Sequence, residues 1–278
     1  MFDTSDGVRL SVHDTGGPGP TVLLVHGWTS DSRVWDRVVP ALAGIRVIRF
    51  DQRGHGESTA GPATITRLGE DLAELITALV PDGPLVLVGH SMGGMAMMAL
   101  AESHPNLVAQ RVSAAVFVST SAGHMGTVTF GLPKPLVKRF LADKPTRTSP
   151  AAPRKRKPLP TFATLIALRW LAFGKTYRWP DVRSVADQAA AGHARTIAAL
   201  RREIVTNHLR DKALAAYADI PTQVLCGTAD KITPLAHAAA IAELLPGAEF
   251  VRYPRAGHML PCEHPTDLAQ RIRSLTTA

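Results

Sequence analysis

Cysteine is scarce in this sequence, and long hydrophobic runs are absent. Its 278 residues include only two cysteines, Cys226 and Cys262, which are too few for a disulfide framework and lack the spacing of metal ligands. The first ten residues, MFDTSDGVRL, carry charges where a signal peptide has its apolar region, and no later apolar run approaches the length of a membrane span. We therefore expect two free thiols, no metal site and a cytoplasmic protein.

Aromatic and acidic residues are also few, and their distribution is uneven. Seven of the 15 aromatic residues lie in residues 121–180, and the same stretch holds twelve Lys and Arg residues but one acidic residue, Asp143. Its net charge is therefore +11, against −3 for the rest of the chain, and nine of the cations lie within residues 134–157. A local excess of positive charge indicates what the protein binds rather than how it folds. It is compatible with peripheral contact to an anionic lipid surface or with an acidic substrate. A run such as PRKRKP is commonly a solvated loop, so no nucleic-acid partner is expected.

Short apolar runs alternate with helical patterns over most of the chain, which is typical of an α/β protein whose mostly parallel sheet has helices on both faces. The expected strands lie at 21–27, 45–51, 85–91, 112–120, 221–227 and 249–254. The expected helices of this part lie at about 31–43, 66–80, 92–104, 234–245 and 265–276. The period-two pattern of VRLSVHDTG, near the start, predicts an antiparallel edge strand.

The composition changes from about residue 121. A stretch rich in proline and basic residues cannot form a sheet strand, and helical patterns follow at about 161–174, 181–190 and 193–208. The simplest organisation is one sheet-based core domain, made of residues 1–120 and 214–278, interrupted by a helical insertion at 121–213. We refer to residues 121–213 as the insertion.

One serine stands in a glycine-rich turn between an expected strand and an expected helix, in the motif GHSMG (89–93). Glycine and serine are ordinary turn residues, so Ser91 by itself could be a small polar turn residue. In a sharp strand-turn-helix connection, however, the two glycines leave room for the turn, and the hydroxyl of Ser91 stands above the sheet as a nucleophile. The backbone N–H of Met92, at the helix start, then points toward developing negative charge.

A second strand end carries the sequence HGW (26–28). A glycine-containing loop there can aim the backbone N–H of Trp28 at the same point as that of Met92. Two such donors would form an oxyanion hole, and loss of one typically costs roughly 3 to 4 kcal/mol of transition-state stabilisation. We expect His26 to orient this loop rather than to transfer a proton.

Two further strand ends carry an acid and a base. Asp230 follows the strand ending at Gly227, and His258 follows the last strand, each after a short glycine-containing loop. A serine hydroxyl is a weak nucleophile until an imidazole takes its proton, and the imidazole works best when a carboxylate fixes its tautomer. The carboxyl ends of parallel strands gather at one edge of a sheet, so these loops should meet Ser91.

The motifs HGW, DQRGHGES, GHSMGG, GTADKITP and GHMLPCEHP, in this order along the chain, resemble those of the serine α/β-hydrolase family. The resemblance covers residues 1–120 and 221–278 well. It implies a mostly parallel central sheet flanked by helices, with a helical cap inserted after the sixth strand. It also implies a catalytic triad of Ser91, Asp230 and His258, an oxyanion hole of Trp28 and Met92, and no metal or organic cofactor.

The substrate is the open part of this prediction. Aromatic residues and positive charge in the insertion favour a small-molecule ester with an apolar acyl group, as in a carboxylesterase, lysophospholipase or monoacylglycerol lipase. Candidate substrate-binding residues are His26, His90, Trp170 and Phe173. A thioesterase, a lactonase, a C–C bond hydrolase or a cofactor-free haloperoxidase (perhydrolase) with the same triad remains an alternative, as does a non-catalytic protein that binds through its basic cap.

Overall fold

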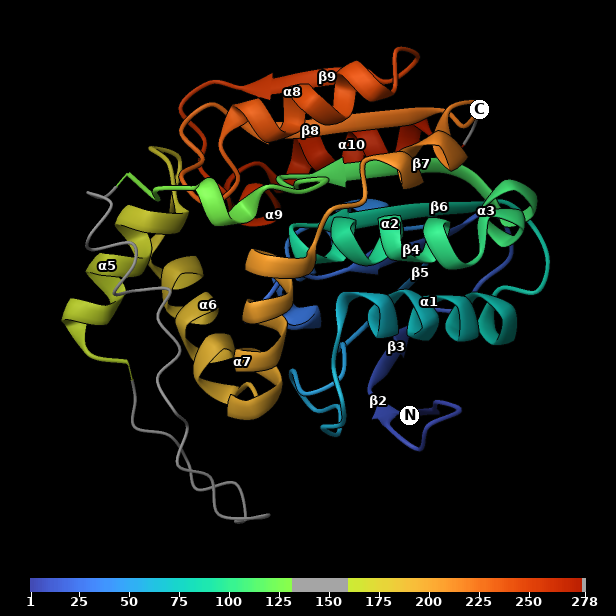
Figure 1. Ribbon diagram of the computed structural model, residues 1–278, viewed down its shortest axis with the longest axis horizontal. Helices are drawn as coiled ribbons and strands as arrows, with labels where there is room; N and C mark the ends of the chain where they lie inside the picture. Colours follow the sequence, from blue (N-terminus) through green and yellow to red (C-terminus); the bar gives the residue numbers. More distant parts are fainter. Residues whose placement is uncertain (132–159, 277–278) are drawn as a thin grey trace.

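The computed structural model describes residues 1–131 and 160–276, and it is organised around one seven-stranded sheet (Figure 1). The strand order is β3-β5-β4-β6-β7-β8-β9, with β3 antiparallel to β5 and all other neighbours parallel. The strands of this sheet are β3 (Val12–Asp14), β4 (Thr21–Val25), β5 (Arg46–Phe50), β6 (Leu85–His90), β7 (Val112–Val118), β8 (Thr222–Gly227) and β9 (Glu249–Tyr253). The α/β class and the expected strands are confirmed.

The N-terminal edge differs in detail from the prediction. The stretch VRLSVHDTG contains two short strands, β2 (Arg9–Leu10) and β3, and β2 pairs with β1 (Phe2–Asp3) as a separate two-stranded sheet. The insertion begins after β7. In chain order β7 is the fifth strand of the main sheet rather than the sixth, because β1 and β2 pair outside that sheet.

Each face of the sheet is covered by its own apolar layer. Successive side chains of a strand point to opposite faces, so Leu23 and Val25 of β4 join one core cluster while Val22 and Leu24 join the other. The helices on the first face are α1 (Ile65–Leu79), α2 (Met92–Ser103), α3 (Pro105–Arg111) and α8 (Leu235–Leu244). The second face is covered by α9 (Leu260–Glu263), α10 (Pro265–Ser274) and two short 3-10 helices, η1 (Ser32–Trp35) and η2 (Val39–Leu42).

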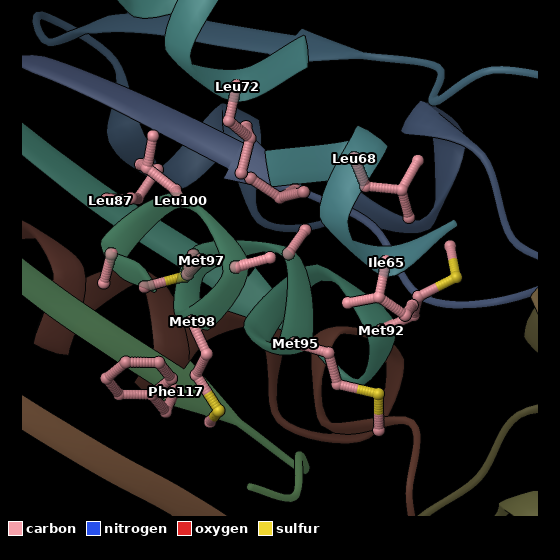
Figure 2. Close-up of a cluster of buried hydrophobic side chains, with 14 of the residues drawn as sticks. Ile65, Leu68, Leu72, Leu87, Met92, Met95, Met97, Met98, Leu100 and Phe117 are labelled. Carbon is pink, nitrogen blue, oxygen red and sulfur yellow. The ribbon is translucent and has the colours of Figure 1, made fainter. Parts of the chain in front are cut away.

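Helix α2, which follows the candidate nucleophile, is buried on all sides. Its residues from Met92 to Ala101 are all buried, because the helix is apolar around its whole circumference. Figure 2 shows its methionines among the side chains of α1, together with Leu87 of β6 and Phe117 of β7. At Gly69 of α1 an added Cβ would lie 2.6 Å from the backbone nitrogen of Leu100, so the two helices touch at their backbones. The start of α2 is therefore held in a fixed position.

Several helix predictions need correction. The single helix expected at 31–43 is instead η1 and η2, because Pro40 lacks an N–H and would break an α-helix at that point. The expected helix at 193–208 is α7 (Ala194–Arg202) followed by a π-helical turn at Glu203–Asn207. The short helices α3 and α9 each begin at or next to a proline and were not predicted.

The other helices of the insertion are α5 (Phe162–Ala172) and α6 (Trp179–Ala191), close to their predicted ranges. Figure 1 shows α5, α6 and α7 at the end of the sheet toward which the parallel strands point. The basic segment 134–157 lies outside the described residues. In the described part of the chain, no helix combines the length and apolar character needed to cross a bilayer.

Candidate active site

Ser91 occupies a strained backbone conformation at the turn between β6 and α2. Its φ is 53° and its ψ −119°, a region that a residue with a Cβ rarely adopts. Two hydrogen bonds hold the turn: the Ser91 N–H donates to the Val118 carbonyl (2.9 Å), and the Thr120 hydroxyl donates to the Ser91 carbonyl (2.7 Å). Strain of this kind persists where the surroundings enforce it, and it is common at functional sites.

The glycines on both sides of Ser91 are required by space. An added Cβ on Gly89 would lie 2.5 Å from the sulfur of Met97, and one on Gly93 would lie 2.2 Å from the carbonyl oxygen of Val25. An added Cβ on the next glycine, Gly94, would lie 2.7 Å from the Thr120 side chain. A Cβ at Gly89 would overlap with atoms of α2, and one at Gly93 would overlap with the end of β4, so the turn has no room for a side chain at either position.

Asp230 and His258, the residues that the sequence predicts as acid and base, contact each other. The Nδ1 atom of His258 lies 2.9 Å from Oδ2 of Asp230, and both side chains are buried. The other carboxylate oxygen accepts the backbone N–H groups of Ile232 (2.8 Å) and Thr233 (2.9 Å). A carboxylate oxygen accepts hydrogen bonds, so this contact is one in which Nδ1–H of His258 donates to Oδ2, and the opposite ring nitrogen, Nε2, makes no hydrogen bond among the described residues.

Thr233 completes this pair and was missed in the sequence. Its hydroxyl donates to Oδ2 of Asp230 (2.9 Å) and lies 3.2 Å from Nδ1 of His258. It lies only three residues after Asp230 in the chain, but no motif singled it out.

Ser91 and His258 line the same cavity, which has a volume of about 200 Å³. The Ser91 hydroxyl makes no hydrogen bond to any residue in the described ranges. The insertion supplies half of the lining, namely Met125, Phe130, Leu168, Leu171, Ala172, Val185, Arg201, Ile204 and Val205. Among the described lining residues only Arg201 carries a formal charge, so the wall opposite the serine is mainly apolar.

The loop after β4 lies against the serine. An added Cβ on Gly27 would lie 3.0 Å from Cβ of Ser91, so the backbone that leads to Trp28 touches the nucleophile. Within the described residues the N–H of Trp28 donates to no acceptor. Met92 is the first residue of α2, where helical N–H groups have no acceptor within the helix. Both predicted oxyanion donors are thus beside Ser91 with unused N–H groups.

The two predicted histidines differ in position. His26 is fully buried and does not line the cavity; its Nε2 accepts the Gln52 N–H (2.8 Å), and its Nδ1 lies 2.8 Å from the Gly27 carbonyl. Burial lowers its pKa, so it orients the loop as a neutral ring. His90 does line the cavity, and its Nε2 donates to the His258 carbonyl (2.9 Å). Burial, with the neighbouring His258, lowers the pKa of His90 to about 3.

The structure places neither Trp170 nor Phe173 in the cavity. Trp170 is 42% exposed, and Nζ of Lys231 lies 3.7 Å above its ring. Phe173 is buried in the apolar layer on the second face of the sheet. The cavity instead receives Leu168, Leu171 and Ala172 of α5, because the rotation of the helix about its axis turns Trp170 outward.

Glu263 is a second residue that sequence reasoning did not assign to the site. It is 8% exposed, and its carboxylate accepts the N–H groups of Gly257 (2.9 Å) and Gly174 (2.8 Å) and the Thr176 hydroxyl (3.1 Å). Burial raises its pKa above the usual value. Gly257 precedes His258, while Gly174 follows α5, so Glu263 links the histidine loop to the insertion. Next to it, the His258 N–H donates to the Ala172 carbonyl (2.8 Å).

Comparison with known proteins agrees with the fold described above. The family model described as "alpha/beta hydrolase fold" matches residues 20–265. The chain therefore belongs to the alpha/beta hydrolase fold family.

Three similar proteins bear on its function. A "probable oxidoreductase EphD" of Mycobacterium tuberculosis is 38% identical over 101 residues, which span 34% of this chain but only 17% of that protein. A pimeloyl-[acyl-carrier protein] methyl ester esterase of Aromatoleum aromaticum is 30% identical over 268 residues, covering 92% of this chain and 98% of the esterase. Among solved structures, a thermophilic esterase of Thermogutta terrifontis is 27% identical, with a TM-score of 0.74 over 98% of this chain and 94% of that one. The chain is thus a hydrolase-fold protein with esterase relatives.

Proposed function

We propose that the protein is a serine hydrolase that cleaves carboxylic esters of apolar acyl groups through an acyl-enzyme on Ser91. The observation that carries the proposal is that a strained serine and an aspartate-bound histidine line one apolar cavity. A serine that served only as a turn residue would not require such a pair beside it. The esterase relatives support the same reaction.

In the proposed first step, Oγ of Ser91 attacks the ester carbonyl carbon while Nε2 of His258 takes the hydroxyl proton. The carbonyl oxygen becomes an oxyanion and accepts hydrogen bonds from the backbone N–H groups of Trp28 and Met92. Asp230 stabilises the imidazolium through Nδ1, and Thr233 and the backbone keep the carboxylate in place. Collapse of the intermediate breaks the ester bond, and the proton on Nε2 passes to the leaving alkoxide.

In the second step, a water molecule gives a proton to His258 and attacks the acyl carbon. The second tetrahedral intermediate collapses, Oγ of Ser91 takes the proton back, and the carboxylic acid leaves. Each step uses only groups of this chain and water.

The substrate preference follows from the wall opposite Ser91. We assign residues 1–120 and 214–278 to a core domain and 121–213 to a cap that covers the acyl group. Leu168, Leu171 and Ile204 of this cap line the cavity, and burial of each acyl methylene against such a wall contributes about 0.8 kcal/mol.

The test is hydrolysis of a panel of p-nitrophenyl esters of increasing chain length, with thioesters and lactones beside them. We expect Ser91→Ala to lower kcat by about 10⁴-fold or more and to abolish labelling by a fluorophosphonate. Ser113→Ala, whose hydroxyl binds the Leu85 carbonyl far from the cavity, is the matched control and should behave as the wild type. Labelling or turnover that survives in Ser91→Ala would refute the proposal.

A further inference from the structure

Helix α5 is apolar on nearly all sides, but only part of its surface is covered. Arg169 is its one charged residue, and Leu165 and Leu168 pack against the core layer beneath it. An α-helix that is apolar around its circumference is normally buried. Figure 1 shows α5 at the periphery of the molecule instead, at the far left of the view.

The uncovered part of α5 is a continuous stripe. Phe162, Ile166 and Trp170 are 74%, 43% and 42% exposed. Residues four apart lie above one another on a helix, so the three side chains form one line along its outer surface. We call these three residues the α5 stripe. Other large exposed apolar side chains, such as Leu209 and Leu244, stand singly, which is normal for a protein surface; a clustered patch marks an interaction site.

The α5 stripe belongs to a stretch of chain whose only charges are positive, and one further cation packs against it. The described stretch 160–180 holds Arg169, Lys175 and Arg178 and no acidic residue. Lys231, from the loop after β8, places Nζ 3.7 Å above the Trp170 ring and donates to the Trp170 carbonyl (2.8 Å). An occupant of this surface must therefore offer both an apolar layer and negative charge.

A second copy of the chain does not meet that requirement. A two-fold dimer places the same patch of both subunits face to face, so the cations around one stripe would meet those around the other. A bilayer containing anionic phospholipid supplies acyl chains for Phe162 and Ile166 and headgroup charge for the cations, and tryptophan is favoured at the level of the headgroups.

We infer that the α5 stripe docks on the surface of anionic phospholipid bilayers, with α5 lying in the interface. The opposite side of the same helix supplies Leu168, Leu171 and Ala172 to the cavity that contains Ser91. The docked helix therefore separates the lipid surface from the candidate active site by its own width. Docking depends on α5 and its cations and does not require that Ser91 be a nucleophile.

The test is co-sedimentation of the full chain with vesicles of phosphatidylcholine alone or of phosphatidylcholine mixed with phosphatidylglycerol. The Ser91→Ala protein is used, so that hydrolysis cannot alter the vesicles and failure of the proposed function cannot affect the result. We expect binding to the mixed vesicles, weakened by added salt, and little binding to phosphatidylcholine. Replacing both Phe162 and Ile166 by serine in this background should reduce the partition coefficient by at least about tenfold.

Leu244→Ser is the matched control, because Leu244 is 47% exposed at the end of α8, outside the stripe. It should leave vesicle binding unchanged. In the protein with Ser91 intact, the double replacement should leave turnover of a short soluble ester unchanged, which shows that the fold is preserved.

Three results would overturn the inference. The first is absence of binding to either vesicle. The second is binding that the double replacement leaves unchanged. The third is a dimer in light scattering that the double replacement dissociates, because the occupant would then be a second copy.

Discussion

The two walls of the cavity are built in different ways. On the sheet side, Ser91, Asp230 and His258 stand on short loops at strand ends. Backbones touch closely there: a Cβ added to Gly93 would lie only 2.2 Å from a backbone carbonyl oxygen. On the insertion side, helices present apolar side chains, and α5 leaves three of them largely exposed. In the proposed function, the first wall would fix the geometry of the reaction, whereas residues of the second could change without moving the reacting groups.

We expect the largest effect on kcat from replacing Asp230, the carboxylate on the sheet side of the cavity. Asp230→Asn places an amide where the carboxylate binds His258 and Thr233, so the imidazole loses its correct tautomer. We expect kcat for a soluble ester to fall about 10⁴-fold with little change in Tm. The control is Asp219→Asn, at an exposed position with no hydrogen bond among the described residues. Near wild-type turnover in Asp230→Asn would show that the pair is structural.

Adding a methyl group should lower stability at the turn that carries Ser91 but not at a glycine with open space around it. Gly93→Ala inserts a Cβ at 2.2 Å from the Val25 carbonyl, and neither backbone can yield easily. We expect a loss of about 3 kcal/mol in stability, or a drop in Tm of roughly 6–10 °C, with loss of turnover. Gly247→Ala, whose nearest neighbour is the Ala218 carbonyl at 3.9 Å, should leave both unchanged. Equal Tm values for the two variants would contradict the close approach of backbones at the turn between β6 and α2.

Glu263 tests the connection between the two walls. In Glu263→Gln one of the two carboxylate oxygens becomes an NH₂ group, which cannot accept an N–H from Gly174 or Gly257. A buried hydrogen bond to a charged group contributes about 1.5–3 kcal/mol, so we expect kcat to fall roughly tenfold or more through displacement of the His258 loop. KM should change little.

The control for Glu263→Gln is Asp267→Asn, which alters the neighbouring carboxylate that binds Tyr253 and Arg271. Its steady-state kinetics should match the wild type. If Glu263→Gln lowers only Tm and leaves kcat intact, Glu263 supports the fold and does not position His258.

The last prediction concerns the dependence of stability on pH. Burial lowers the pKa of His55 and His90 to about 3 and that of His208, at the end of the insertion, to about 4. An unfolded histidine titrates near about 6.5. Below that pH the unfolded chain binds protons that the folded chain does not, so stability is complete above about pH 6.5 and is lost as the pH falls toward 3 to 4, by about 1.4 kcal/mol per pH unit for each histidine.

His208→Gln should remove one of these contributions and so flatten the dependence of the free energy of unfolding on pH. The side chain donates to the Ser121 carbonyl at 2.7 Å, a bond that glutamine can reproduce. Urea unfolding at about pH 5 and about pH 7.5 measures the slope. Replacing His13, which is exposed, should leave the slope unchanged; an unchanged slope in His208→Gln would show that this histidine protonates equally in both states.

The sheet side of the molecule could be predicted in detail because its information is local. Alternating apolar runs fix the strands, GHSMG fixes a turn that only glycines permit, and strand ends of one direction must share an edge. The exceptions lie where local rules compete, as at Pro40, which breaks a helix expected from its apolar spacing. Glu263 was missed because its partner Gly174 becomes a neighbour only when separate loops meet, whereas Thr233 lies in the same loop as Asp230 but belongs to no motif of its own.

By itself, the sequence determined the fold class, the candidate nucleophile and the positions of its acid and base, since each depends on backbone geometry within a few residues. The tertiary structure decided which residues of the insertion line the cavity. Apolar spacing shows that residues 161–174 form a helix, but its rotation is set by packing against the sheet and α6. That packing turned Leu168 and Leu171 inward and Trp170 outward, and so created both the apolar wall of the cavity and the α5 stripe.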